Sequence, residues 1–198
     1  MTPELLNQFA AIVGEKHAIR DAAGMAGYMT EWREIWVGKS PLVMRPANTE
    51  EVSRILKLAS ETGTAIVPQS GNTGLVGGQI PFEDGRELLL SLDRMTKILN
   101  VDAADGTMTV QAGATLKSVQ DAADEAGRLF PLRIASEGSC RIGGNLSTNA
   151  GGLNVLAYGN ARDLCLGLEV VLPDGRIWNG LRRLRKDNTG YDLKNLFI

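Results

Sequence analysis

The sequence has little of what a metal site, a membrane span or a nucleic-acid interface needs. Among its 198 residues are one histidine and two cysteines, and Cys140 and Cys165 are too far apart for a paired zinc motif. A formal net charge of -2 excludes a broad positive surface for nucleic acid or an anionic membrane. No stretch approaches the roughly 20 apolar residues of a membrane-spanning helix. We therefore expect a soluble protein with no metal and with reduced, packed thiols.

The beginning of the chain also lacks a recognisable targeting signal. Residues 1–8 include Glu4 and have no basic segment followed by an apolar run, which a secretory signal would need. The composition, 43% hydrophobic and 22% charged, is ordinary for a globular protein. The sequence-based expectation is a cytoplasmic protein.

Alternating helix and strand signals predict an α/β fold of two small lobes. Apolar spacing predicts a helix over residues 3–13, and Asn48, Glu51 and Gly63 suit the N-cap, its partner and the stop of a second helix. Strands over residues 42–44 and 65–68 flank that helix, which indicates a parallel strand–helix–strand unit. Further predictions are strands over 87–92 and 107–111, a helix over 116–126 and a hairpin over 166–178. We interpret residues 1–40 as a helical flank, 41–105 as the first lobe and 106–198 as the second.

Three other features are interpreted as structural. Trp32 and Trp36 are expected to pack beneath a loop, and His17 is expected on the surface, outside any catalytic site. The basic run over residues 182–186 lacks interleaved aromatics and is followed by Asp187, so we interpret it as a solvated face rather than a nucleic-acid site.

A first glycine-rich segment, PQSGNTGLVGG, occupies residues 68–78 directly after a predicted strand. Such a segment can present successive backbone N–H groups, which is what a pyrophosphate needs for close approach. It has neither the Gly-Lys-Ser/Thr ending of a P-loop nor the spacing of GxGxxG. A glycine-rich surface turn remains the alternative at this point.

A second segment poor in bulky side chains runs from Gly138 to Gly152. Core packing alone does not explain so many small and hydrogen-bonding residues. Two such segments favour one extended, dinucleotide-sized ligand lying between two lobes. A nucleotide-binding module for ATP or NAD remains an alternative to a flavin site.

Three blocks give a more specific resemblance. They are PQSGNTGLVGG, IGGNLSTNAGGLNVLAYGN and GLEVVLPDGRIWNGLRRLRKDNTGYDLKNLFI. Together they resemble the FAD-linked 2-hydroxyacid dehydrogenases, of the D-2-hydroxyglutarate and D-lactate dehydrogenase type, in the vanillyl-alcohol oxidase and p-cresol methylhydroxylase superfamily. The resemblance runs from about Pro41 to Ile198 and implies the two-lobed, p-cresol methylhydroxylase-type FAD-binding domain.

In that family the first segment wraps the FAD pyrophosphate, and the second approaches the ribityl chain and the flavin ring. The resemblance carries the pyrophosphate role to Pro68, Gln69, Ser70, Gly71, Asn72, Thr73 and Gly74, and also to Gly77 and Gly78. It carries the flavin-side role to Ser136, Glu137, Gly138, Ser139, Ile142, Gly143 and Gly144. Further cofactor contacts are implied at Asn145, Thr148, Asn149, Ala150 and Gly151.

The sequence departs from the family pattern at two places. Ser70 stands where near relatives usually have glycine, which adds a hydroxyl but narrows the allowed backbone angles. Family members also continue beyond the LFI motif into a GSEGTLG-like segment and a cap domain with the substrate-binding basic residues and a histidine-rich, often metal-assisted active site. We therefore expect a truncated FAD-binding domain: a fragment, an engineered piece or one part of a split enzyme.

The resemblance implies an enzyme that oxidises a 2-hydroxyacid to a 2-oxoacid and passes electrons to another protein or a quinone. This chain alone is expected to be inactive, with no catalytic residue of its own. FAD is expected to bind non-covalently, because the first segment has no histidine and a bond through Cys140 is not typical of near relatives. The alternative is a non-catalytic FAD-binding subunit that needs a partner chain.

Overall fold

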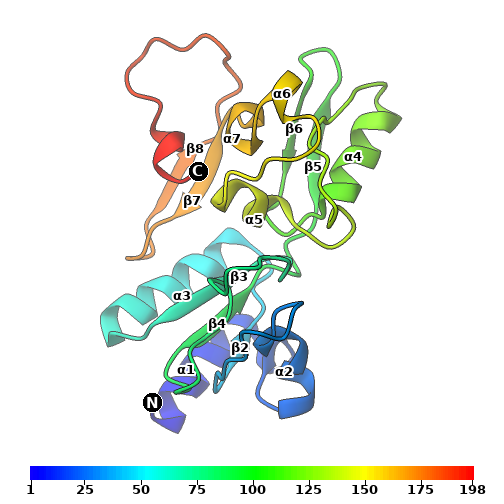
Figure 1. Ribbon diagram of the computed structural model, residues 1–198. Coiled ribbons are helices and arrows are strands. Elements are labelled where there is room, and N and C mark those ends of the chain that lie inside the picture. The colour runs from blue at the N-terminus through cyan, green and yellow to red at the C-terminus, as the bar shows by residue number, and fades with distance from the viewer. The chain divides into compact units, whose positions relative to one another are not determined.

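The computed structural model describes residues 1–198 (Figure 1). The chain has a mixed α/β fold that divides into two compact units. The first unit comprises residues 1–95 and 171–177, and the second comprises residues 96–170 and 178–198. The sequence-based assignment of residues 41–105 and 106–198 to two cofactor-binding lobes stays a prediction.

A four-stranded sheet, in the order β1-β2-β4-β3, forms the centre of the first unit. Its strands are β1 Ala18–Ile19, β2 Val43–Met44, β3 Ile66–Gln69 and β4 Leu88–Ser91. Strands β2 and β3 both run parallel to β4, whereas β1 runs antiparallel to β2. The expected strand–helix–strand unit is therefore parallel, with β4 inserted between its two strands.

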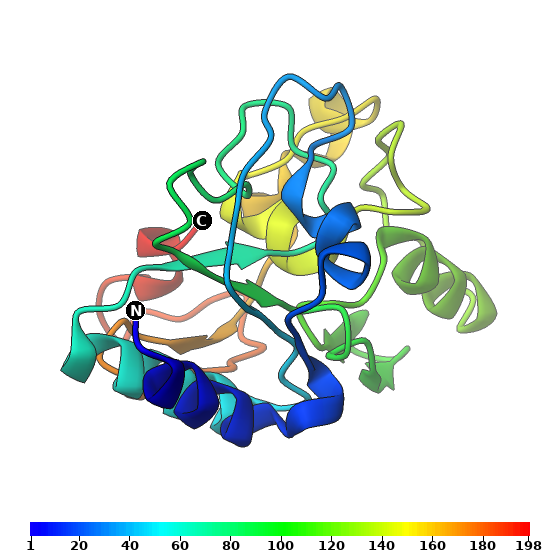
Figure 2. The ribbon, with the colours of Figure 1, turned by 90° about the horizontal axis from the view of Figure 1, so that it is seen from below.

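Helices α1 (Pro3–Val13) and α3 (Thr49–Thr62) lie side by side against this sheet (Figures 1 and 2). The Asn48 side chain accepts a hydrogen bond from the Glu51 N–H at 2.8 Å, and Gly63 ends α3 in the left-handed region. The core between helices and sheet contains fully buried side chains, among them Phe9, Leu42, Met44, Ile55 and Leu88. Each such side chain stabilises the fold by about 1.5–3 kcal/mol.

The second unit combines an antiparallel strand pair with short helices. Strands β5 Ile98–Asp102 and β6 Thr107–Val110 pair with each other, and α4 Leu116–Glu125 follows them. Three short helices come next: α5 Ile142–Ser147, α6 Val155–Tyr158 and α7 Ala161–Leu164. A small core forms around Leu116, Leu132, Cys140 and Ala161. A 3-10 turn, η2 Leu193–Leu196, lies near the chain end.

Strands β7 Leu168–Val171 and β8 Ile177–Gly180 form the expected hairpin. Its tip, residues 171–177, belongs to the first unit and touches α3. The Ser53 hydroxyl donates to the Gly175 carbonyl, and a Cβ on Gly175 would lie 2.7 Å from the Ser53 carbonyl oxygen. Gly175 also has a φ of +85°, so both the turn and the close approach require glycine here.

The structure corrects several sequence-based expectations. Sequence analysis did not predict α2 (Ala22–Met29), α5 or β5, nor the short elements β1, α6 and α7. Helix α5 escaped detection because Gly143, Gly144 and Asn145 are poor helix formers, and its hydrogen bonds form despite that composition. The packing prediction for the tryptophans was wrong for Trp32, which is 82% exposed. No helix of the chain has both the length and the apolar character needed to span a membrane.

Candidate functional site

The first glycine-rich segment, called the first loop below (residues 68–78), leaves the sheet at its carboxyl edge. Strand β3 ends at Gln69, and the loop continues without a helix to residue 78. Because β2 and β4 run parallel to β3, the residues that follow them, including Arg45 and Asp93, meet at the same edge. Open parallel sheets bind ligands outside this edge.

Side-chain amides hold the first loop in shape. Gln69 is 2% exposed, and its Nε2 donates to the carbonyls of Tyr28 at 2.9 Å and Gln79 at 3.1 Å. Gln79 Nε2 in turn donates to Asn72 Oδ1 at 3.2 Å and to the Gly74 carbonyl at 2.7 Å. The loop is therefore tied at its start, middle and end by carboxamides.

The backbone N–H groups of this loop are left available. None of those from Gly71 to Gly78 donates a hydrogen bond to another protein atom. A Cβ added to Gly78 would meet nothing within 4 Å, so an approaching group would find open space there. A run of unused N–H groups in a glycine-rich loop supplies the donors that phosphate oxygens need.

The backbone angles at Ser70 and Asn72 show whether a serine can stand at position 70, where near relatives usually have glycine. Asn72 takes the left-handed conformation, with a φ of +52°, whereas Ser70 has no positive φ. Asparagine tolerates that region better than other residues with a Cβ. Serine therefore fits position 70 without backbone strain.

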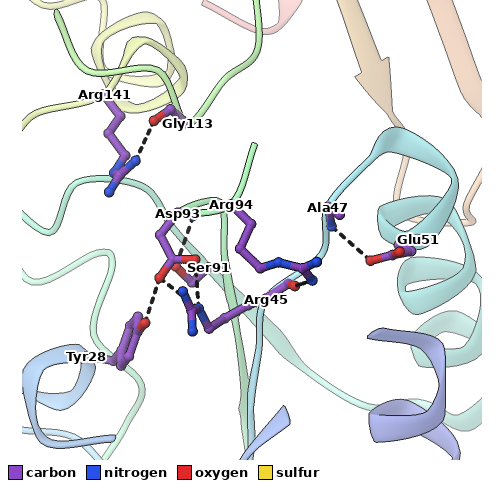
Figure 3. A network of polar contacts seen from close by, with 9 residues as sticks. All are labelled: Tyr28, Arg45, Ala47, Glu51, Ser91, Asp93, Arg94, Gly113 and Arg141. Atoms are coloured by element: carbon purple, nitrogen blue, oxygen red, sulfur yellow. Dashed lines mark hydrogen bonds and ion pairs between the residues drawn. The ribbon is translucent and has the colours of Figure 1, made fainter. Parts of the chain in front are cut away.

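A polar network stiffens the same edge of the sheet (Figure 3). Asp93 accepts a hydrogen bond from the Tyr28 hydroxyl at 2.6 Å, and both of its oxygens lie 2.9 Å from Arg45 Nε. The hydrogen bond to Asp93 raises the pKa of Arg45. Arg94 donates to the Arg45 carbonyl at 2.6 Å. The network links α2 to the ends of β2 and β4.

Sequence analysis did not identify Tyr28, Arg45 or Asp93 as part of this site. A signal was present, because Arg45 and Asp93 each come directly after a predicted strand, over residues 42–44 and 87–92. Parallel strands bring such positions to one edge. Sequence alone did not establish that β2 and β4 are neighbours, and that pairing brings the two side chains together.

The flavin-side residues form a second loop (residues 136–151) in the second unit. It begins with a turn in which the N–H groups of Ser139 and Cys140 both donate to the Ser136 carbonyl at 2.8 Å. The Glu137 carboxylate accepts from Gln120 Nε2 at 3.2 Å, and Arg133 lies 3.5 Å from it. A Cβ on Gly138 would meet nothing within 4 Å.

Helix α5 fills the middle of the second loop. The Gly143 N–H donates to the Ala112 carbonyl at 2.7 Å, and a Cβ on Gly143 would lie 2.9 Å from the Ala112 Cβ. Close packing against Ala112 therefore explains the glycine at position 143, whether or not the cofactor contacts it. Ile142, Gly143, Gly144 and Asn145 all lie in α5, and Ser136 to Ser139 lie just before it.

Asn145 is the most unusual polar residue of the second loop. It is 4% exposed, its Nδ2 lies 3.6 Å from Cys140 Sγ, and its Oδ1 is buried without a hydrogen-bond partner. An unpaired buried oxygen costs about 1–3 kcal/mol, so Oδ1 is an acceptor that a hydrogen-bond donor would satisfy. Cys140 is 5% exposed and packs in the core of this unit.

The end of the second loop is held by its own hydrogen bonds. Thr148 Oγ1 donates to the Gly144 carbonyl at 2.9 Å, and the Ala150 N–H donates to the Asn145 carbonyl at 2.8 Å. Asn149 has a φ of +46°, and its side-chain oxygen accepts from the Arg162 N–H at 3.0 Å. A Cβ on Gly151 would lie 3.2 Å from Asn160 Oδ1.

The structure thus brings each predicted set together within one unit. The first set, Pro68 to Gly74 with Gly77 and Gly78, is continuous on the first loop. The second set, Ser136 to Gly151, is continuous through the turn, α5 and the residues that follow. Their contacts with a cofactor stay a prediction.

Comparisons with known proteins assign the family. The model of a family described as FAD binding domain matches residues 40–180. The chain belongs to this family. FAD is accordingly its cofactor, as the sequence predicted.

Curated relatives extend the likeness over nearly the whole chain. D-2-hydroxyglutarate dehydrogenase from Arabidopsis thaliana is 44% identical over 98% of this chain, which covers 34% of that protein. The enzyme of the same name from Danio rerio is 45% identical over 100% of this chain, covering 37% of it. The chain therefore spans about a third of the length of these relatives.

Solved structures show the same fold. Alkyldihydroxyacetonephosphate synthase aligns with a TM-score of 0.87 at 22% identity, over 100% of this chain and 37% of that one. p-Cresol methylhydroxylase aligns with a TM-score of 0.78 at 20% identity, over 98% and 40%. The FAD-binding domain thus has the p-cresol methylhydroxylase-type fold that the sequence predicted.

The comparisons overturn the expectation of a cytoplasmic protein. Both curated relatives are named as mitochondrial enzymes. That expectation rested on the absence of a secretory signal in residues 1–8 and of an apolar run long enough to span a membrane. Neither absence reports on transport to an organelle.

Proposed function

We propose that this chain is the FAD-binding part of an oxidoreductase that converts a 2-hydroxyacid, of the D-2-hydroxyglutarate or D-lactate type, into the 2-oxoacid. The names of the curated relatives support this reaction class. FAD, when bound, supplies the acceptor for the hydride removed from the substrate's α-carbon. The chain's own residues bind and orient the cofactor.

The first loop fits the pyrophosphate of FAD. The observation that carries this step is the run of N–H groups from Gly71 to Gly78 that have no protein partner. Two phosphates need several donors at close range, and the bare backbone at Gly78 allows that approach. Gln69 and Asn72 keep the loop open by bonding elsewhere through their side chains.

The second loop fits the flavin side of the cofactor. Gly138 offers backbone without a neighbouring side chain, and Asn145 Oδ1 is an acceptor that a donor group would satisfy. We propose contacts from Ser136 to Ser139 and from α5. Attachment is non-covalent in this proposal, because Cys140 is buried in the core and no histidine lies in the first loop.

We propose that substrate binding, substrate chemistry and transfer of electrons to a protein or quinone acceptor depend on residues outside this chain, which spans about a third of the length of the curated relatives. The chain alone, loaded with FAD, is therefore expected to bind the cofactor without oxidising D-lactate or D-2-hydroxyglutarate. Rapid bleaching of the flavin by either compound would contradict this division of labour.

A hybrid enzyme tests the activity itself. This chain replaces the matched third of the Arabidopsis thaliana enzyme, and FAD content and turnover of D-2-hydroxyglutarate and D-lactate are measured. We expect a flavin-containing hybrid that oxidises at least one of the two compounds. The matched control carries Gly78→Val and should lose both FAD and turnover. A hybrid that holds FAD and oxidises neither compound would contradict the proposed function.

A further inference from the structure

A segment of the first unit that lies outside the matched family range forms hydrogen bonds with the first loop. Asn72 Nδ2 donates to the carbonyls of Gly27 at 3.1 Å and Thr30 at 2.9 Å, and the Tyr28 carbonyl accepts from Gln69. These acceptors lie at the end of α2 and just after it. The family match begins only at residue 40.

Two further contacts join the next residues of this segment to the other half of the loop. The Arg33 guanidinium donates through Nη2 to the Leu75 carbonyl. The Trp36 ring packs against Gly77 so closely that a Cβ on Gly77 would lie only 2.8 Å from it. Gly77 also has a φ of +80°, so its glycine is explained by the turn and by Trp36 together.

Glu31 organises the segment that presents Arg33 and Trp36. It is 1% exposed, and its two carboxylate oxygens accept hydrogen bonds from the N–H groups of Arg33 and Ile35, each at 2.9 Å. Its own N–H donates to the Trp36 carbonyl at 3.3 Å. These backbone N–H groups, Arg33 first, hold the pKa of Glu31 below its usual value.

The location of this buried carboxylate is informative. Burying a charge is costly unless the charge is paired and hydrogen-bonded, and the partners of Glu31 all belong to its own turn: the N–H groups of Arg33 and Ile35, and the Arg33 guanidinium, whose Nε lies 3.7 Å away. Glu31 supports no hydrophobic core, because neighbours such as Trp32 and Ile35 are 82% and 62% exposed. The turn at Glu31 instead fixes the positions of Arg33 and Trp36, which contact the first loop.

We propose that a clamp sets the shape of the first loop, and that Glu31 is a positioning residue for FAD binding. The clamp consists of the residues that contact the loop or hold those contacts in place: Gly27, Tyr28, Thr30, Glu31, Arg33 and Trp36. This inference rests on the proposed function of that loop. Glu31 acts through Arg33 and Trp36 and touches no cofactor atom itself. Disturbing it should weaken binding of the pyrophosphate side of FAD and leave flavin-side binding unchanged.

The test compares Glu31→Gln with Glu34→Gln, an exposed residue of the same turn that undergoes the same change of charge. FAD and riboflavin, which lacks the phosphates, are titrated into each folded protein by flavin fluorescence. Losing one buried backbone hydrogen bond should raise the Kd for FAD about tenfold in Glu31→Gln. The Kd for riboflavin should stay within about twofold, and Glu34→Gln should match the wild type for both ligands. A general loss of structure would weaken both ligands together.

Arg33→Ala carries the same test if Glu31→Gln fails to fold, because the Arg33 side chain is 38% exposed. It should raise the Kd for FAD about threefold to fivefold without affecting riboflavin. In the double variant the Kd for FAD should rise by less than the product of the two single increases, since both residues act on one loop. Unchanged FAD affinity in both single variants would contradict the proposed role of the clamp. If Gly78→Val also binds FAD as tightly as the wild type, the proposed role of the loop fails with it.

Discussion

The first and second loops each contain four glycines, but the backbone N–H groups of the two loops are used differently. In the first loop the N–H groups from Gly71 to Gly78 have no protein partner, and side chains from outside hold the loop open. In the second loop most N–H groups donate to protein carbonyls, in the turn at Ser136, within α5 and, from Ile142 and Gly143, to Ala114 and Ala112. The fate of the backbone N–H groups therefore separates the two loops better than glycine content does.

The largest expected effect is a loss of FAD binding in Gly78→Val. The new side chain meets no protein atom near its Cβ, so the fold should be unaffected, but it obstructs the approach of a phosphate to the backbone. Affinity for FAD should fall about 100-fold, as expected for losing one or two charge-assisted hydrogen bonds. Calorimetric titration measures this, with Ala11→Val as the control, which enlarges an exposed side chain on α1 outside both loops and the clamp. An equal loss of FAD affinity in both variants would show that the effect is not specific to the first loop.

In the second loop region the corresponding experiment should affect folding instead. A Cβ on Gly152 would lie 2.1 Å from the Arg133 carbonyl oxygen, so the backbone must move to accept Gly152→Ala. The free energy of unfolding should fall by about 2–3 kcal/mol. Gly138→Ala has open space and should unfold at the wild-type denaturant concentration. If Gly152→Ala were as stable as Gly138→Ala, the packing explanation for Gly152 would be wrong.

Asn145→Leu should separate stability from binding. Removing a buried oxygen without a partner should leave the free energy of unfolding unchanged or raise it by about 1 kcal/mol. Affinity for FAD should nevertheless fall about fivefold to tenfold if Oδ1 accepts a hydrogen bond from the cofactor. Denaturant unfolding of the apoprotein and titration with FAD measure the two quantities. Loss of stability without loss of affinity would show that Asn145 serves the fold.

The smallest expected effect is on the pH dependence of stability. The pKa of Glu31 is lowered in the folded protein, so its contribution is fully present above the unfolded pKa of about 4.3 and is lost as pH falls through the folded value. The difference in unfolding midpoint between the wild type and Glu31→Gln should be constant from about pH 8 to 5 and shrink below about pH 4.3. A difference that changes near neutral pH would point to another group.

Much of the fold followed from local signals in the sequence. The helix over Pro3–Val13, the Asn48 cap of α3 and the β7–β8 hairpin were predicted because each depends on neighbours in the chain. Helix α5 was missed because its packing around Asn145 offsets a poor intrinsic propensity. The insertion of β4 between β2 and β3 was also out of reach, since it depends on pairing distant segments.

The candidate site shows the same limit. Glycine-rich segments and a family resemblance located both loops. The clamp escaped notice because Glu31 and Arg33 look like ordinary surface charges in a sequence, and only the burial of Glu31 sets it apart. Long-range contacts, such as that from Asn72 to Thr30, leave no local pattern to detect.

The central claim is that the first loop binds the pyrophosphate of FAD through its backbone. The most direct measurement is the affinity of the wild-type chain for FAD and for riboflavin, by titration at equal ionic strength. We predict one FAD per chain, bound at least about 100-fold more tightly than riboflavin, because only FAD can use the N–H groups of Gly71 to Gly78. Equal affinities for the two ligands, or no binding of FAD, would contradict the claim.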